Sequence, residues 1–272
     1  MMGILAGKRA IVTGAASGIG LAIARAFARQ GCELELVDVD DDGLRRAGDE
    51  LGARVLGSHV LDLSDTDEVD VFARRFVEEG GPVDVLVNNA GTLWFDSFER
   101  MPMSEWDRLM RVNLDAPARL IHGLLPAMRR RPGAHIVNIS SILGLTPKRK
   151  MAAYCTSKYG LVGLSLALRA ELSPAIGVSV VCPGLVRTDL YASAIQEGRS
   201  TGQRKQPGYL SAPPERVADQ VVRAIEKNKR MVIVTKHARA VRAAHGLAGW
   251  AIDLNQLRRN ARRQSAASGT SS

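Results

Sequence analysis

The chain has 272 residues, of which 46% are hydrophobic, and a formal net charge of +9 at pH 7. This length and apolar content favour one large α/β domain with a full core over two small domains. No apolar run approaches the roughly 18 residues of a membrane span, and residues 1–9 run directly into a predicted strand, which leaves no room for a signal peptide.

The positive charge is concentrated near one end of the chain. Residues 223–263 hold eleven Lys and Arg against two acids, Glu226 and Asp253, so the rest of the chain is neutral overall. Cys32, Cys155 and Cys182 show neither a disulfide framework nor metal-ligand spacing. We therefore expect reduced thiols, a cytoplasmic protein without a metal site, and attraction for acidic partners only through the basic segment.

Short apolar strands alternate with helical patterns along the chain. In order, we expect a strand at 9–13, a helix at 17–30, strands at 33–38, 55–61 and 83–88 separated by helices, a helix at about 104–131, a strand at 135–139, a helix at about 154–172, a strand at 178–182, a helix opened by Pro213 and Pro214, and a strand at 231–234. This rhythm predicts a single doubly wound, Rossmann-type α/β domain over 1–234, with a parallel seven-stranded sheet flanked by helices.

A glycine-rich turn, residues 13–20, follows the first predicted strand and opens the first helix. Glycines there let the backbone approach a pyrophosphate, which the N–H groups and positive end of the helix would hold. The candidate cofactor residues of this turn are Gly14, Ser17, Gly18, Ile19 and Gly20. A tight strand-to-helix connection without a ligand is the alternative interpretation.

Asp38 ends the second predicted strand, where a carboxylate can accept hydrogen bonds from both hydroxyls of an adenosine ribose. A 2′-phosphate beside it would meet a like charge costing up to about 4 kcal/mol at ~4 Å. Neither Ala16 nor Ser17 supplies a compensating cation, so NAD is favoured over NADP. An Asp that only caps the next helix is the alternative, and residues 40–42 fit that role better.

Tyr154 and Lys158 lie four residues apart in a predicted helix, thirteen residues after Ser141. At this spacing the phenol and the ammonium share one helix face. The ammonium favours the phenolate and lowers its pKa from the usual value near ~10, which suits general acid/base chemistry. Taken alone, Tyr-x-x-x-Lys is common on exposed helices, so the pair depends on a cofactor site for its meaning.

Together, these motifs resemble the short-chain dehydrogenase/reductase family over residues 7–234. Further motifs occur in that family's order: Asp62-Leu63, Asn88-Asn89-Ala90-Gly91, Asn113, and Pro183-Gly184-Leu185-Val186-Arg187-Thr188. The resemblance implies that Asp62 and Leu63 contact the adenine, that Asn89, Ala90 and Gly91 flank the ribose, and that Val186 and Thr188, which follow Pro183 and Gly184, meet the nicotinamide carboxamide.

The resemblance also implies a catalytic tetrad of Asn113, Ser141, Tyr154 and Lys158. In that scheme Ser141 binds the substrate oxygen, Tyr154 exchanges the proton, Lys158 lowers the Tyr154 pKa and holds the nicotinamide ribose, and Asn113 binds a relay water. Ser140 is the alternative serine, but the thirteen-residue interval selects Ser141.

Pro117 lies four residues after Asn113 and has no backbone N–H. The Asn113 carbonyl therefore lacks its i+4 donor, so we expect the helix to bend there and a water to bind. The alternative is that Pro117 breaks the helix and Asn113 caps it.

Substrate specificity is expected from loops at the carboxyl ends of the strands. These loops are rich in apolar residues: Leu93, Trp94, Phe95, Leu143, Leu145, Met151, Leu185, Tyr191 and Leu210. Residues 189–212 read as a mobile lid with several glycines. We expect an apolar secondary alcohol or ketone, although apolar loop residues often only pack a lid.

Residues 235–265 form a predicted amphipathic basic helical extension, and 266–272 a disordered tail. The extension puts the family's usual tetramer in doubt, but a homo-oligomer, dimer or tetramer, is still expected. Docking of the extension on its own body or on a partner subunit is favoured, with peripheral membrane contact as the alternative.

The function predicted from the sequence is an NAD-dependent dehydrogenase or reductase that interconverts a small-molecule secondary alcohol and its ketone. The alternative is a non-catalytic, NAD-sensing scaffold that binds a membrane or anionic partner through its basic extension. Nucleic-acid binding is not expected, because the basic run has no interleaved aromatics beyond Trp250.

Overall fold

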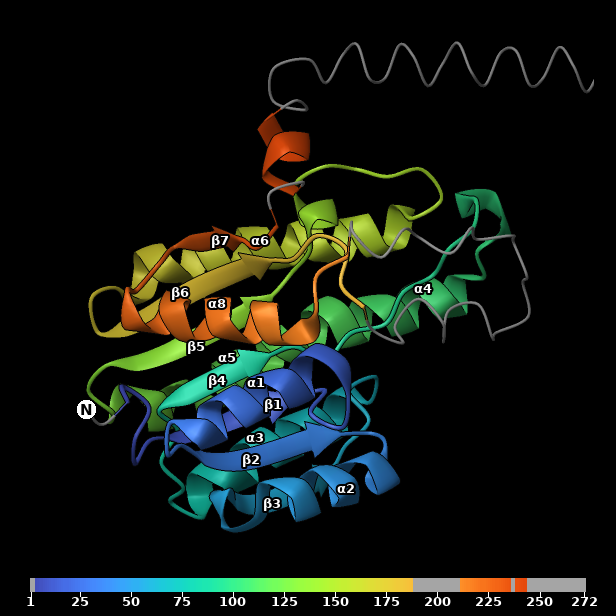
Figure 1. Cartoon of the computed structure of the whole chain (residues 1–272). Coiled ribbons are helices and arrows are strands. Elements are labelled where there is room, and N and C mark those ends of the chain that lie inside the picture. The colour runs from blue at the N-terminus through green and yellow to red at the C-terminus, as the bar shows by residue number, and fades with distance from the viewer. Residues whose placement is uncertain (1–2, 188–210, 236–237, 244–272) are drawn as a thin grey trace, which may run out of the picture.

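The structure is a computed structural model that describes residues 3–187, 211–235 and 238–243. In these residues one parallel sheet contains β1 (Arg9–Thr13), β2 (Glu33–Asp38), β3 (Val55–Val60), β4 (Val85–Asn88), β5 (Ala134–Ile139), β6 (Ile176–Cys182) and β7 (Met231–Ile233). The strand order is β3-β2-β1-β4-β5-β6-β7, and every neighbouring pair is parallel. The predicted doubly wound, seven-stranded sheet is confirmed (Figure 1).

Helices cover both faces of the sheet. They are α1 (Gly18–Arg29), α2 (Asp41–Leu51), α3 (Thr66–Glu78), α4 (Met103–Met110), α5 (Ala116–Arg129), α6 (Ala152–Leu172) and α8 (Pro214–Glu226). Buried side chains of α1, α2 and α8 form one core with the sheet, and those of α3, α5 and α6 form another. Because successive strand residues face opposite sides, Val12 enters the first core and Ile11 the second.

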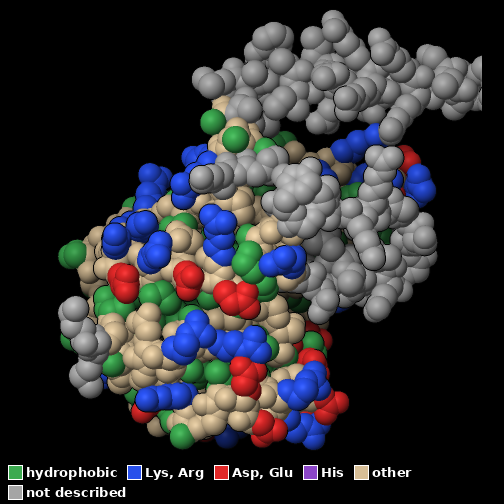
Figure 2. Space-filling view, in the orientation of Figure 1, with side chains coloured by type: hydrophobic (Ala, Val, Ile, Leu, Met, Phe, Trp, Pro, Cys, Tyr) green, Lys and Arg blue, Asp and Glu red, His purple; other side chains and the backbone are tan. Residues whose placement is uncertain are grey.

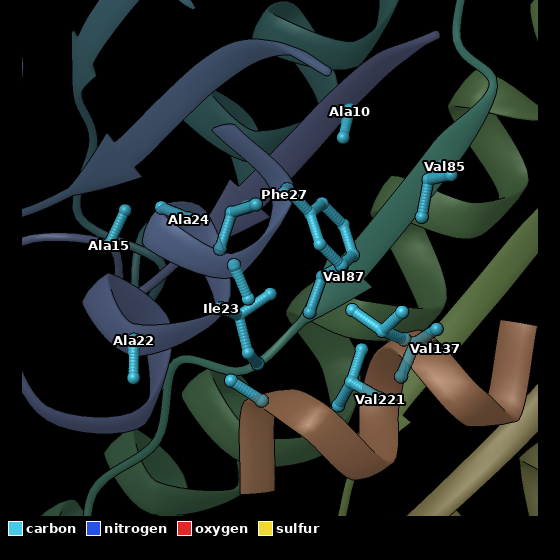
Figure 3. Close-up of a cluster of buried hydrophobic side chains, with 14 of the residues drawn as sticks. Ala10, Ala15, Ala22, Ile23, Ala24, Phe27, Val85, Val87, Val137 and Val221 are labelled. Carbon is cyan, nitrogen blue, oxygen red and sulfur yellow. The ribbon is translucent and has the colours of Figure 1, made fainter. Parts of the chain in front are cut away.

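Apolar packing fixes the position of α1 on the sheet. Ile23 and Phe27 of α1 are fully buried, and Figure 3 shows them facing Val87 of β4 and Val221 of α8. The chain turns into α1 directly after β1, so this packing also holds the glycine-rich turn at the end of β1.

β1 has β2 on one side and β4 on the other, so the chain order reverses between β1 and β4. In open α/β sheets such a switch point leaves a crevice at the carboxyl ends of the strands. Thr13 joins the two strand ends, since its hydroxyl oxygen accepts the N–H groups of Asn89 and Ala90 at 3.0 and 3.1 Å. The Asn89 amide in turn donates to the Thr13 carbonyl at 2.9 Å.

The helix expected at 104–131 consists of α4, a π-helical turn over Arg111–Asp115, and α5. The alternative, that Pro117 breaks the helix and Asn113 caps it, is wrong, because Asn113 lies inside the π turn and the helix continues beyond Pro117. Pro117 has no N–H to donate to the Asn113 carbonyl four residues earlier. In a π turn an N–H bonds the carbonyl five residues earlier instead of four, as the Ala116 N–H bonds the Arg111 carbonyl.

Other boundaries differ from expectation by one or two residues. Thus β4 begins at Val85, two residues later than predicted, and α6 begins at Ala152, two residues earlier. Most of the predicted lid at 189–212 and of the extension at 235–265, and all of the tail at 266–272, lie outside the described residues. Of the extension, residues 238–243 are described and are helical.

Candidate functional site

A cleft of about 440 Å³ lies at the switch point of the sheet. It brings together most of the residues that the sequence singled out for cofactor binding: Gly14, Ser17, Gly18, Ile19, Asp38, Asp62, Leu63, Asn89, Ala90, Gly91, Tyr154 and Lys158. These residues end or follow β1, β2, β3 and β4, or lie on α1 and α6. The cleft therefore brings residues from across the sheet together at the carboxyl ends of its strands.

The glycine-rich turn is packed too closely for side chains. A Cβ on Gly14, whose φ is +68°, would lie 2.9 Å from the Ala90 Cα, and one on Gly20 would lie 1.8 Å from the Gly14 carbonyl oxygen. No side chain caps α1, although Ser17 occupies the N-cap position. The first N–H groups of the helix are thus left for a ligand, which suits a phosphate group.

Asp38 fixes the turn and also borders the cleft. Its carboxylate accepts the N–H of Ala16 at 2.9 Å and that of Val39 at 2.8 Å. Asp40, not Asp38, caps α2 by accepting the Gly43 N–H at 3.0 Å. A carboxylate held by backbone amides at this position can receive further donors from a ligand in the cleft.

Tyr154 and Lys158 lie one turn apart on α6, 6% and 3% exposed. The Lys158 Nζ donates to the Ile139 carbonyl at 3.0 Å and lies 5.8 Å from the centroid of the Tyr154 ring. Burial lowers the Lys158 pKa to about 8, against a smaller opposing influence of Cys182. An ammonium has three donors and Ile139 accepts one of them, so the others can serve hydroxyl groups in the cleft.

The two adjacent serines have different surroundings. The Ser140 hydroxyl donates to the Lys158 carbonyl at 2.9 Å, which ties β5 to α6 although Ser140 also lines the cleft. The Ser141 oxygen accepts the Leu143 N–H at 3.1 Å at the start of a 3-10 turn over Ile142–Gly144. Ser141 is not among the residues lining the cleft, but its own O–H can still donate.

Asn113 is fully buried and does not line the cleft. Its side chain accepts the Thr92 N–H at 2.8 Å and donates to the Thr92 carbonyl at 2.9 Å and the Ser157 hydroxyl at 3.1 Å. Ser157 lies beside Lys158 on α6, so Asn113 clamps the loop after β4 to the helix that carries the Tyr154/Lys158 pair.

The last predicted cofactor motif lies beside the cleft rather than on its lining. The Pro183 carbonyl accepts the Ile142 N–H at 2.8 Å, and Gly184 packs against Thr235. Val186 forms a parallel bridge with Ala212. This bridge links the described chain before residue 188 to the described chain after residue 210. Thr188 lies outside the described residues.

Sequence reasoning missed several residues that line the cleft: Val39, Leu61, Thr92, Arg108, Val112 and Ile139. Arg108 lies on α4, and Val112 lies in the π-helical turn that follows it. Neither residue belongs to a motif, and the helix rotation that turns them toward the cleft depends on tertiary packing.

In the described part of the chain, no helix combines the length and the apolar character needed to cross a membrane.

Comparisons with known proteins give a consistent result. Residues 8–198 match the model of the family described as short chain dehydrogenase. "Probable oxidoreductase EphD" of Mycobacterium tuberculosis is 36% identical over 247 residues, 85% of this chain; the matched part spans 41% of that relative. The chain therefore corresponds to about two fifths of this curated relative's length.

Two solved structures have the same fold. One, assigned as an NAD(P)-dependent gluconate 5-dehydrogenase from Beutenbergia cavernae with NADP bound at low occupancy, has a TM-score of 0.77 and 32% identity, and the match covers 87% of this chain and 98% of that one. The other is a short-chain dehydrogenase/reductase from Burkholderia phymatum in complex with NAD, with a TM-score of 0.78, 28% identity, and coverage of 92% and 96%. The chain belongs to the short chain dehydrogenase family.

Proposed function

We propose that the protein interconverts a secondary alcohol and its ketone with NAD as the redox partner. The observation that supports this best is the buried Tyr154/Lys158 pair, which borders the same cleft as the glycine-rich turn and Asp38. A phenol and a desolvated ammonium have few structural uses at the edge of a large cleft, whereas proton exchange with a hydroxyl requires both groups.

Each residue of the site has a separate role in this reaction. When bound, the nicotinamide accepts or supplies the hydride. Tyr154 removes or returns the substrate hydroxyl proton, and the positive charge of Lys158 stabilises the phenolate. Ser141, held by the Leu143 amide, donates its O–H to the substrate oxygen. Asn113 fixes the loop after β4 against α6 through Thr92 and Ser157.

The residues of the cleft fit a dinucleotide. The uncapped start of α1 and the closely packed Gly14 and Gly20 suit a pyrophosphate. Asp38 suits the adenosine ribose hydroxyls and disfavours a 2′-phosphate. Solved relatives bind NAD in one case and NADP in another, so the preference for NAD rests on Asp38 in this chain.

Asp38→Asn should shift the cofactor preference towards NADP. Asn keeps an oxygen for the Ala16 amide but removes the negative charge that repels a 2′-phosphate. We expect the ratio of kcat/KM for NADP to that for NAD to rise roughly tenfold to a hundredfold, because solvent screens part of the repulsion. Asp62→Asn, a matched change elsewhere on the cleft, should alter the ratio far less; equal shifts in both variants would contradict the assignment.

The proposed substrate is apolar. Tyr154 packs in one cluster with buried Leu93, Leu143 and Met151, against which Trp94 and other aromatic residues are packed. An apolar wall beside the proton-exchanging phenol favours a hydrophobic alcohol, since burial of apolar surface would supply most of the binding energy.

A spectrophotometric screen tests this function. Purified protein is mixed with NAD or NADP and a panel of polar and apolar secondary alcohols over a range of pH, and NADH or NADPH formation is followed. We expect turnover with apolar alcohols and NAD. If no alcohol or ketone in the panel reacts in either direction while NAD still binds, the proposal fails and the NAD-sensing scaffold is favoured.

A further inference from the structure

A second groove, of about 580 Å³, is lined by residues of α6, α8 and β7 and by Arg239 and Arg242. Its apolar lining comes mainly from Leu145, Val162 and Leu166, together with Met231 and Ile233 of β7. Among the described residues, β7 pairs only with β6, and all three of its residues line this groove. None of the described residues that line this groove also lines the cleft at the switch point.

The rim of this groove is cationic. Lys229, Arg230, Arg239 and Arg242 line it, and its described lining residues include no Asp or Glu. The Arg239 Nε donates to the Ile233 carbonyl at 3.1 Å, and the Arg242 Nη1 lies 2.9 Å from the Met231 sulfur. Lys and Arg side chains gather on this side of the molecule, around β7 and above α8 (Figure 2). These cations disfavour pairing of the β7 edge with another strand.

Two occupants from this chain itself fit poorly. Residues 244–263, which follow the groove-lining helical residues, contain Arg258, Arg259, Arg262 and Arg263 against the single acid Asp253, so they carry the same sign of charge as the rim. A second copy related by a two-fold axis would place the same patch on both sides of the interface. Cations would then face cations, which costs free energy in a contact that excludes water.

We propose that this cationic groove binds anionic phospholipid and holds the protein on a negatively charged membrane surface. The rim of Lys229, Arg230, Arg239 and Arg242 would pair with lipid phosphates, and the apolar floor would receive the adjacent hydrocarbon. The sequence beyond the groove adds Trp250, Leu254 and Leu257 among its arginines, a composition typical of membrane interfaces. Single-stranded nucleic acid is disfavoured, because no aromatic residue is among the described lining residues.

Co-sedimentation with vesicles tests the proposal on the full chain. Vesicles of phosphatidylcholine alone and of phosphatidylcholine mixed with phosphatidylglycerol are compared at low and high salt. We expect binding only to the anionic vesicles, with release by salt. Arg239→Gln/Arg242→Gln should weaken the partition roughly thirtyfold, since each cation at an anionic surface contributes about fivefold. Arg129→Gln/Arg130→Gln, which removes two exposed cations at the end of α5, should leave it unchanged.

Several outcomes would overturn the proposal. Equal binding to neutral and anionic vesicles, or no binding to either, would exclude an anionic lipid site. An equal loss in both double variants would show a response to net charge rather than to the groove. A change from dimer to monomer in Arg239→Gln/Arg242→Gln, without vesicle binding by the unmodified chain, would assign the groove to a second copy. Thermal melts establish that each variant is folded.

Discussion

Replacing Tyr154 with Phe should lower kcat by roughly three orders of magnitude, which is the range expected when a general acid/base group is lost. The substitution removes one hydroxyl and keeps the ring, which packs in a buried cluster with Leu143 and Met151. The fold should therefore survive, and the Kd for NAD should change by only a few-fold, because the glycine-rich turn and Asp38 remain. Stopped-flow hydride transfer and fluorescence titration with NADH measure the two quantities.

The chain offers a matched control in Tyr159, the next tyrosine on α6, which is 41% exposed. Tyr159→Phe removes the same hydroxyl from the same helix and should leave kcat unchanged. Full activity in Tyr154→Phe would refute the proton-exchange role. Equal losses in both variants would instead indicate damage to α6.

The architecture could be predicted because apolar strands and helices alternate without interruption. Parallel strands buried on both faces read as continuous apolar runs, as in the β4 sequence Val85-Leu86-Val87. The ends of the strands and helices could be predicted only to within one or two residues, because they depend on tertiary contacts. Asp84 was predicted to lie in β4, but its carboxylate accepts the Arg9 N–H and the Arg131 guanidinium, so it anchors the start of the strand instead.

The cleft could be predicted in part for a similar reason. Residues in short motifs at strand ends, such as Gly14 and Asp38, have fixed places in a doubly wound sheet, so their spacing locates them. Arg108 comes from a helix whose rotation depends on packing, and the motifs gave no signal for it. The three hydrogen bonds of the Asn113 side chain could not be predicted from a local sequence pattern, because their partners Thr92 and Ser157 are distant in sequence.

Lys158→Met should abolish most activity yet make the protein without cofactor more stable at pH 7. Burial lowers the Lys158 pKa from 10.5 to about 8, so the folded state carries an ammonium that prefers water. A pKa shift of that size corresponds to a loss of about 3 kcal/mol in the free energy of unfolding at pH 7. The lost bond to the Ile139 carbonyl offsets roughly 1 kcal/mol of the gain on removing this charge, so the free energy of unfolding should rise by about 2 kcal/mol.

The pH dependence of the free energy of unfolding tests whether the buried Lys158 charge causes the difference in stability. Below pH 8 both folded and unfolded chains hold the Lys158 proton, and the native state carries the full cost of the buried charge. Between pH 8 and about 10.5 the unfolded chain binds more protons than the folded one, so the free energy of unfolding of the unmodified protein rises with pH. Lys158→Met lacks this rise, and its advantage should shrink from pH 7 to pH 9.

Urea unfolding of both proteins at pH 7 and pH 9 measures this difference directly. Buried Cys32 and Cys182, whose pKa values are raised to about 12 by burial, oppose the trend at higher pH, but they are present in both proteins and largely cancel. Lys148→Met removes an exposed lysine that lies over the Phe95 ring, so it should change the free energy of unfolding by less than about 1 kcal/mol and show no gain that fades with pH. A Lys158→Met variant that is less stable by the same amount at both pH values would show that the ammonium is well accommodated in the fold. A gain that fades with pH would show that this protein retains a destabilising charge where its chemistry needs one.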